Sequence, residues 1–134
     1  MSDSSRKAIR SYLEALDSHG DIADHLTDDV GLEMAGSPGA DAVRGREAVA
    51  EFIRSFHRVA FDARVAVRQV VAEDDRAIAE LVFEGVHTGE FAGVAAAGAH
   101  VSLPYCVAYD LRDDLISGLR VYLSVPDLVA QLRS

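Results

Sequence analysis

Three tyrosines and one histidine are the residues of this chain best suited to act on a small molecule inside a folded domain. Tyr12 lies on the apolar face of a predicted first helix, and Tyr105 and Tyr109 share one face of a predicted strand. His57 directly follows Phe56 near the end of another predicted helix, and an imidazole ordinarily titrates near neutrality. A phenol can donate a hydrogen bond to a carbonyl or enolate oxygen, and an imidazole can move a proton. This set therefore suits acid–base chemistry that needs no cofactor.

Each of these residues also has a purely structural interpretation. Tyr12 must face inward for its helix to pack against a sheet, so a core tyrosine is as well supported as a hydrogen-bond donor. Tyr105 and Tyr109 fit the core of a strand, and His57 fits the solvent edge of a helix end. His87 opens a loop that contains Gly89 and Gly93, and a role in bracing that loop is favoured over chemistry.

The periodicity of apolar residues predicts the elements that must position these side chains. A first helix carries Ile9, Tyr12, Leu13 and Leu16 and stops at His19-Gly20; a short second helix covers residues 21–27. Alternation predicts a strand through Val30, Leu32 and Met34, and a glycine- and proline-containing loop at 36–39 near the pocket mouth. A further helix begins near Gly45 and places on one face Val49, Phe52, Ile53 and Phe56.

Long strands dominate the rest of the chain. One passes through Val65 and Val67, and three more cover residues 77–87, 100–111 and 115–124, with acidic turns at 73–75 and 112–114. Nothing helical separates the last strands, which disfavours a parallel βαβ architecture. The order of elements predicts a single α+β domain over residues 1–134, with helices on one face of an antiparallel sheet.

Composition narrows the possible partners. The 134 residues are 49% apolar, enough for a core with a cavity, and the net charge is −9. Nucleic acid and anionic membranes are bound through basic surfaces, so neither is an expected partner. No apolar run reaches the roughly 18 residues of a membrane span, and residues 1–10 lack the apolar segment of a secretion signal. A cytoplasmic location is therefore expected.

Motifs for metals and cofactors are missing from the sequence. The five histidines show no metal-ligand spacing, and no phosphate-binding loop, dinucleotide-binding glycine motif or nucleophile elbow occurs. Lys7 falls off the apolar face of the first helix, so Schiff-base chemistry has no candidate lysine. Cys106 lies among apolar strand residues and fits a buried, inert thiol. We expect no metal and no cofactor.

The strand-rich segment 77–124, with an amphipathic helix before it and residues 126–132 after it, resembles the SnoaL-like branch of the ketosteroid-isomerase and nuclear-transport-factor superfamily. This resemblance implies a cone, in which a curved antiparallel (mixed) sheet wraps around helices and one central apolar pocket. It also implies a homodimer, for which the outer face of the sheet would offer Val82, Val86 and Tyr122.

The resemblance carries over one catalytic residue. Steroid isomerases of the superfamily use a tyrosine on the first helix, which corresponds to Tyr12. Their general base corresponds to Met34 and their second donor to Val107. SnoaL-type cyclases place a histidine at Val107 and an aspartate at Val121, and the epoxide hydrolases also keep that aspartate. These positions are aliphatic here, so only the tyrosine is retained.

Strand alternation completes the predicted pocket. The epoxide hydrolases need an arginine–aspartate pair where Leu81 and Phe83 stand, and both should face the concave side. The predicted substrate-binding residues are Met34, Phe52, Phe56, Leu81, Phe83, Tyr105, Val107 and Val121, and the predicted catalytic residues are Tyr12, His57 and Tyr109. A shift of one residue would instead put Arg120 and Tyr122 in the pocket.

Two functions fit this pocket. The first is a cofactor-independent enzyme that cyclises, isomerises or dehydrates a hydrophobic polyketide-, terpenoid- or steroid-like molecule by proton transfer and by holding it in its reactive shape. The second is a non-catalytic protein that binds a hydrophobic small molecule or serves as an accessory subunit. Aliphatic residues at Met34, Val107 and Val121 suit the second role.

Overall fold

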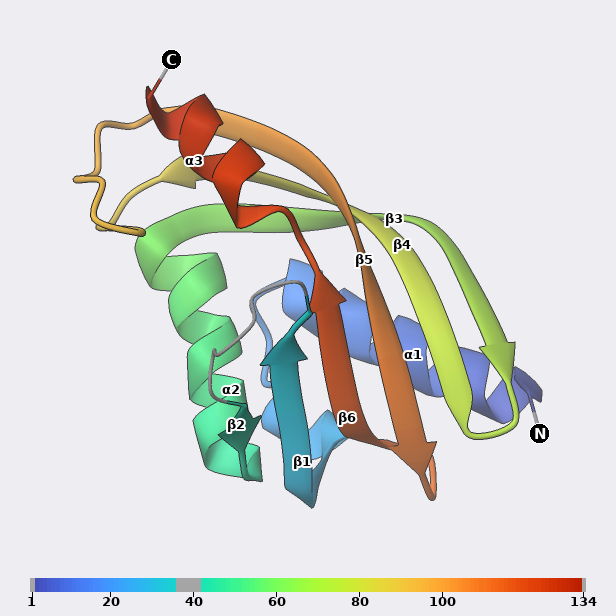
Figure 1. Ribbon diagram of the computed structural model, residues 1–134. Helices are drawn as coiled ribbons and strands as arrows, with labels where there is room; N and C mark the ends of the chain where they lie inside the picture. Colours follow the sequence, from blue (N-terminus) through green and yellow to red (C-terminus); the bar gives the residue numbers. More distant parts are fainter. Residues whose placement is uncertain (1, 36–41, 134) are drawn as a thin grey trace.

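A curved sheet and the helices beneath it form the part of the protein that the computed structural model describes, residues 2–35 and 42–133 (Figure 1). Within these ranges the strands are β1 (Leu26–Met34), β2 (Val43–Arg44), β3 (Phe61–Glu73), β4 (Arg76–His87), β5 (His100–Arg112) and β6 (Leu115–Tyr122). They lie side by side in the order β2-β1-β6-β5-β4-β3. All neighbours are antiparallel except β1 and β6, which run parallel.

The expected α+β fold is therefore confirmed, with a sheet that is mixed and not closed. The α-helices of the described residues are α1 (Ser2–Asp17), α2 (Arg46–Arg54) and α3 (Val125–Arg133). In Figure 1, α1 and α2 lie under the curve of the sheet. None of the described helices has the length and apolar character needed to cross a membrane.

Alternation along β5 decides which face of the sheet looks inward. Tyr105, Val107 and Tyr109 are buried on the concave side. On β6, Tyr122 is 53% exposed on the outer face, where Arg120 pairs with Asp110 of β5 at 2.8 Å. The register predicted from the sequence is confirmed, and the alternative with Arg120 and Tyr122 in the pocket is wrong.

Helix α1 packs through one apolar stripe and stops where the sequence predicts. The stripe is fully buried and consists of Ile9, Tyr12, Leu13 and Leu16. Beyond the last helical residue, His19 adopts a left-handed backbone with φ 60, and the amide of Gly20 donates to the carbonyl oxygen of Ala15 at 2.7 Å. This backward hydrogen bond satisfies a carbonyl that the helix itself leaves free.

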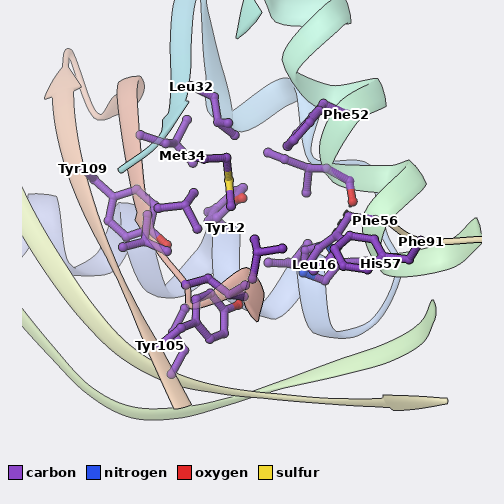
Figure 2. A pocket seen from close by; sticks show the side chains of 17 residues that line it. Tyr12, Leu16, Leu32, Met34, Phe52, Phe56, His57, Phe91, Tyr105 and Tyr109 are labelled. Carbon is purple, nitrogen blue, oxygen red and sulfur yellow. Dashed lines mark hydrogen bonds between the residues drawn. The ribbon is translucent and has the colours of Figure 1, made fainter. Parts of the chain in front are cut away.

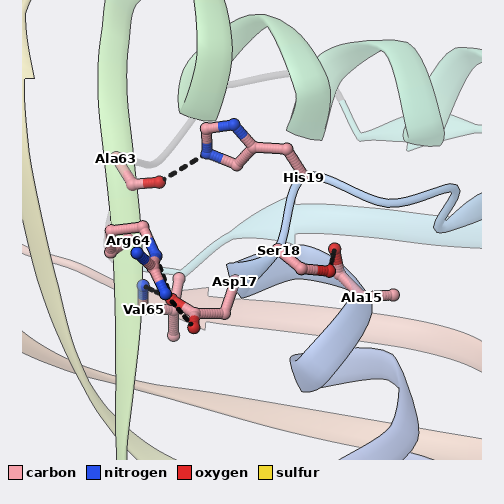
Figure 3. A network of polar contacts seen from close by, with 7 residues as sticks. All are labelled: Ala15, Asp17, Ser18, His19, Ala63, Arg64 and Val65. Atoms are coloured by element: carbon pink, nitrogen blue, oxygen red, sulfur yellow. Dashed lines mark hydrogen bonds and ion pairs between the residues drawn. The ribbon is translucent and has the colours of Figure 1, made fainter.

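The end of α1 is fastened to β3 by side chains (Figure 3). Asp17 accepts two hydrogen bonds from the Arg64 guanidinium, at 2.9 and 2.8 Å, and one from the backbone amide of Val65 at 2.9 Å. The Arg64 guanidinium holds the pKa of the Asp17 carboxyl below its ordinary value. The ring of His19 contacts the carbonyl oxygen of Ala63 at 2.8 Å. These contacts fix the helix that brings the first tyrosine under the sheet.

The short helix predicted over residues 21–27 is wrong. The chain makes only a 3₁₀ turn at Ala23–His25, and β1 begins at Leu26 because pairing with β6 starts at that residue. Ile22 and Leu26, at the two ends of this segment, are nevertheless buried. The loop predicted at 36–39 lies outside the described residues.

The two predicted acidic turns are confirmed. Asp74 joins β3 to β4 with φ 52, and Asp113 and Asp114 join β5 to β6 with φ 53 and 63. Left-handed backbone is unfavourable for most residues, but aspartate tolerates it because its short side chain can bond locally. Both hairpins therefore close tightly, and they set the strand pairing that brings the inward-facing tyrosines together.

Candidate functional site

An apolar cavity of about 210 Å³ lies between the concave face of the sheet, α1 and α2 (Figure 2). It is lined by Tyr12, Leu16, Leu32, Met34, Phe52, Ile53, Phe56, His57, Leu81, Phe91, Tyr105, Val107, Tyr109, Leu119, Val121, Leu123 and Val125. None of these 17 described residues carries a formal charge at neutral pH. The polar groups that face the cavity are therefore phenols and one imidazole.

All the predicted site residues except Phe83 line this cavity, and their roles in catalysis or binding stay predictions. Phe83 is fully buried one layer behind the wall. The ring of Phe56 stacks on it, with the centroids 4.9 Å apart and the planes at 23°. Phe83 therefore does not line the cavity, because Phe56 covers that position of β4, and its contact with a ligand stays a prediction.

The three tyrosines gather at one side of the cavity (Figure 2). The rings of Tyr12 and Tyr109 meet edge to face with centroids 6.0 Å apart. No hydrogen bond joins the hydroxyl of Tyr12, Tyr105 or Tyr109 to another described residue. Burial raises the pKa of all three phenols, and the neighbouring phenols raise those of Tyr105 and Tyr109 further. They therefore stay protonated at neutral pH and can serve as donors.

His57 lies in a π-helical turn, Ser55–Ala60, that continues α2. The i→i+5 hydrogen bonds of such a turn widen it, so each side chain rotates less about the axis than in an α-helix. His57, predicted just outside the apolar stripe, is consequently brought onto it and is only 7% exposed. Its placement at a solvent edge, which the sequence also allowed, is therefore wrong.

The protonation state of His57 follows from its contacts. Nδ1 lies 2.8 Å from the carbonyl oxygen of Ile53, and a carbonyl can only accept, so Nδ1 carries the hydrogen. Nε2 is buried and has no hydrogen-bond partner among the described residues. Burial lowers the pKa of His57 to about 4, more than the hydrogen bond to Ile53 raises it. At neutral pH His57 is therefore uncharged, with an unshared electron pair on Nε2.

The loop between β4 and β5 supports the π-helical turn and closes the cavity wall. The amides of Thr88 and Gly89 both donate to the carbonyl oxygen of Ala60 at 3.0 Å, and the Thr88 hydroxyl donates to that of Val59 at 3.0 Å. A Cβ on Gly89 would lie 2.5 Å from the Val59 oxygen, so only glycine fits this approach. The same loop places Phe91 on the cavity, with its ring 5.6 Å from that of Phe56.

Phe91 is the lining residue that sequence reasoning missed most clearly. It is the only aromatic residue in a loop of mostly glycine and alanine, residues 88–99, and that isolation was a usable signal. His87, which precedes the loop, was predicted to brace it. The structure buries His87 against Phe61, with ring centroids 5.3 Å apart, and its backbone amide donates to Ala99 at 2.9 Å. It does not line the cavity.

The polar groups of the cavity stand on opposite sides. Figure 2 shows Tyr12, Tyr105 and Tyr109 at one side and His57 at the other, beside Phe56 and Phe91. The phenols can donate to an oxygen atom, and His57 Nε2 can accept a hydrogen bond or a proton. Among the described residues, no three histidine, cysteine, aspartate or glutamate side chains are grouped so that they could hold a metal ion.

Comparison with known proteins gives a consistent result. The sequence model of the SnoaL-like polyketide cyclase family matches residues 6–133. A candidate polyketide cyclase from Xanthomonas campestris pv. campestris is 25% identical, with a TM-score of 0.82 and 97% of each chain covered. A candidate SnoaL-like polyketide cyclase from Jannaschia sp. CCS1 has a TM-score of 0.88 at 18% identity, over 100% of this chain and 94% of that one.

An enzyme of a different activity shares the fold. An epoxide hydrolase of the LEH-like type from M. tuberculosis is similar with a TM-score of 0.77 and 19% identity, over 98% of this chain and 91% of that one. At such identity the likeness is one of fold. No curated protein matches the chain.

Proposed function

The chain belongs to the SnoaL-like polyketide cyclase family, and from this premise we propose that it is a cofactor-independent enzyme that moves a proton on a hydrophobic small molecule. The observation that carries the proposal is the buried Nε2 of His57, which has no partner among the described residues and shares a charge-free cavity with three phenols. The lining is almost wholly apolar, so each hydrogen bond made inside the cavity to a developing charge is strengthened relative to one made in water.

The proposed step is proton abstraction next to a conjugated carbonyl group. The C–H bond of the substrate breaks, its proton passes to Nε2 of His57, and its electron pair moves onto the carbonyl oxygen. The oxyanion then accepts hydrogen bonds from Tyr12 and Tyr109. A donor aimed at such a charge in a dry site contributes roughly 3–4 kcal/mol, or 10²–10³ in rate. Return of the proton to another carbon completes an isomerisation. Alternatively, attack of the carbanion on a second carbonyl closes a ring, and the alkoxide so formed takes the proton back from His57.

The low basicity of His57 sets how much the phenols must contribute. With a pKa of about 4, protonating His57 at pH 7 costs about 4 kcal/mol. One well-placed phenol offsets about that amount by stabilising the oxyanion. The imidazolium and the oxyanion also attract one another across a medium of low dielectric constant. The tyrosines and His57 are therefore proposed to act together, and neither would suffice alone.

The aliphatic residues of the cavity set this assignment apart from the mechanisms that the resemblance implies. Met34, Val107 and Val121 line the cavity at the positions where the resemblance implies acidic or histidine side chains. Val107 and Val121 are directly paired on β5 and β6, so an apolar patch replaces those groups. Proton transfer in this chain would consequently come from the π-helical turn of His57, on the opposite side of the cavity.

Exchange of hydrogen for deuterium tests the proposal without knowledge of the product. The protein would be incubated in D₂O with aromatic polyketide ketones and steroid enones, and deuterium incorporation followed by NMR and mass spectrometry. We expect incorporation that falls at least 10²-fold in His57→Ala and Tyr12→Phe. His100→Ala alters an exposed histidine and serves as the control. Unchanged exchange in the two site variants would refute the assigned roles.

A non-catalytic binding protein is the second candidate. The specific observation in its favour is the weak basicity of His57 in a cavity without any charged lining residue. Tight binding of a compound from the same panel, with neither deuterium incorporation nor conversion over hours, would establish this function and remove the first.

We also propose that the protein forms a homodimer through the outer face of the sheet. That face exposes Val71, Ile78 and Tyr122, at 59%, 54% and 53%. Val71 pairs with Ile78 across β3 and β4, so the two form one apolar patch. Val82 and Val86, expected at this surface, are half-buried within it. Large exposed apolar side chains grouped on one face are typical of an interface.

A further inference from the structure

We infer that the cavity selects an uncharged, flat ligand with a hydrogen-bond donor at one end and a carbonyl oxygen at the other. The inference rests on the proposed function, because it takes the same cavity as the site and names the class of compound that this site binds before Nε2 of His57 takes a proton from carbon. It concerns binding selectivity, so it can be measured whether or not turnover occurs.

The donor end of the ligand follows from His57. Its Nδ1 hydrogen is already engaged by the carbonyl oxygen of Ile53 at 2.8 Å, so Nε2 can only accept. This atom is buried without a partner among the described residues. An unsatisfied buried acceptor is costly, and a ligand hydroxyl that donates to it removes that cost. A ligand that offers only an acceptor at this end leaves the cost in place.

The acceptor end follows from the tyrosines. The hydroxyls of Tyr12, Tyr105 and Tyr109 form no hydrogen bond to another described residue. All three remain protonated because burial disfavours the phenolate. A carbonyl oxygen has two lone pairs and can accept from two of these donors at once. The tyrosine side of the cavity therefore matches a ligand carbonyl.

The lack of charge in the ligand follows from the lining. A carboxylate or ammonium group would lose its hydration on entry and would meet no opposite charge among the lining residues. The phenols could bond a carboxylate, but they would not compensate for the loss of water around a full charge. Acids and amines should thus be rejected in favour of neutral compounds of the same shape.

The flat body of the ligand follows from the walls between the two ends. Phe52, Phe56 and Phe91 line the side next to His57, and Met34 and Leu32 lie between that side and the tyrosines (Figure 2). Aromatic rings pack well against other flat rings. Because the donor and acceptor sites lie on opposite sides, one ligand atom cannot serve both. A conjugated body can join them and pass electron density from the hydroxyl to the carbonyl oxygen.

Four two-ring probes test this class directly. These are 6-hydroxy-2-naphthaldehyde, with both end groups; 2-naphthaldehyde, without the donor; 2-naphthol, without the carbonyl; and 6-hydroxy-2-naphthoate, with a charge. Titration calorimetry at pH 7 should give the hydroxyaldehyde a Kd about tenfold lower than either singly substituted probe, as one buried hydrogen bond implies. The naphthoate should bind at least about 100-fold more weakly than the hydroxyaldehyde. The absorption band of the hydroxyaldehyde should move to longer wavelength on binding.

Variants assign each end to its residue. His57→Leu should abolish the preference for the hydroxyl and keep that for the carbonyl. If the leucine variant fails to fold, His57→Phe takes its place, because neither side chain can accept a hydrogen bond. Tyr109→Phe should weaken the preference for the carbonyl and keep that for the hydroxyl. Equal Kd values for all four probes with the unaltered protein, or tightest binding of the naphthoate, would overturn the inference. Selective binding without deuterium exchange upholds it and removes the proposed catalysis, whereas exchange without selectivity upholds catalysis and removes this inference.

Discussion

Replacement of His57 by glutamine should make the protein less sensitive to acid. His57 has a pKa of about 4 when folded, because burial disfavours the imidazolium, and an ordinary value near 6.5 when unfolded. The unfolded chain therefore binds a proton at this site at higher pH than the folded chain. As the pH falls below about 6.5, protonation of the unfolded state lowers the free energy of unfolding, and the loss is complete below about 4.

The size of this effect follows from the difference between the two pKa values. A difference of about 2.5 pKa units corresponds to about 3 kcal/mol, at about 1.4 kcal/mol for each unit. Stability from this source is fully present above the unfolded pKa and is lost through the window from about pH 6.5 to about pH 4. Glutamine keeps an N–H that can bond to the Ile53 carbonyl but does not titrate, so the variant should lack this term.

Urea unfolding followed by circular dichroism measures the effect. Curves at half-unit steps from pH 7.5 to pH 4 would be compared between the unaltered protein, His57→Gln and the exposed-site control His100→Gln. Carboxylates titrate in all three proteins and cancel in the differences. Across the window, we expect the free energy of unfolding of the unaltered protein to fall by about 3 kcal/mol more than that of His57→Gln. The His100→Gln control should behave like the unaltered protein. Parallel pH profiles for the unaltered protein and His57→Gln would refute the burial of a neutral imidazole.

Three further predictions concern the supports of the site and the outer face. Gly89→Ala should lower the free energy of unfolding by about 1–3 kcal/mol, because its Cβ would overlap the backbone oxygen of Val59. Gly20→Ala, whose Cβ would make ordinary contacts, should change this free energy little, and urea unfolding of both variants makes the comparison. Asp17→Asn, which keeps an acceptor for the backbone amide of Val65, should cost about 0.5 kcal/mol and Asp17→Ala about 1–2, with the asparagine effect vanishing at high salt. Tyr122→Glu should give a monomer in sedimentation at micromolar concentration where the unaltered protein sediments as a dimer, and equal sedimentation of both would contradict the proposed interface.

The inward face of the sheet could be predicted because a strand has a period of two. Once one residue of β5 is assigned inward, Tyr105, Val107 and Tyr109 must all follow it. Cross-strand pairing then carries the assignment to β6, where Val121 lies opposite Val107. Helix α1 was predictable for a similar reason, since its apolar residues recur with the period of a helix. In both cases the pattern within one segment is sufficient for the prediction, and no contact with a distant segment has to be known.

The position of His57 could not be predicted in this way. The residues of the π-helical turn have no pattern that separates them from the end of an α-helix. The turn is held by contacts with Thr88 and Gly89, which lie far along the chain and approach only when β3 and β4 have paired. The wall residue Phe91 depends on the same approach. The start of β1 at Leu26, where the sequence predicts a helix, likewise depends on pairing with β6 rather than on local sequence.

The weak basicity of His57 and the lack of charge in the cavity have one physical origin. A carboxylate at Val107 or Val121 would favour the imidazolium and raise the pKa of His57 toward neutrality, which would make it a stronger base. The same carboxylate would be buried in an apolar cavity, would repel a ligand oxyanion and would compete with the ligand for the hydroxyls of Tyr12 and Tyr109. A neutral lining avoids these penalties and leaves the phenols free for the ligand. In the proposed mechanism, His57 accepts a full proton at neutral pH when a ligand oxygen bound to those phenols takes up the negative charge, so proton transfer would depend on a ligand that reaches both sides.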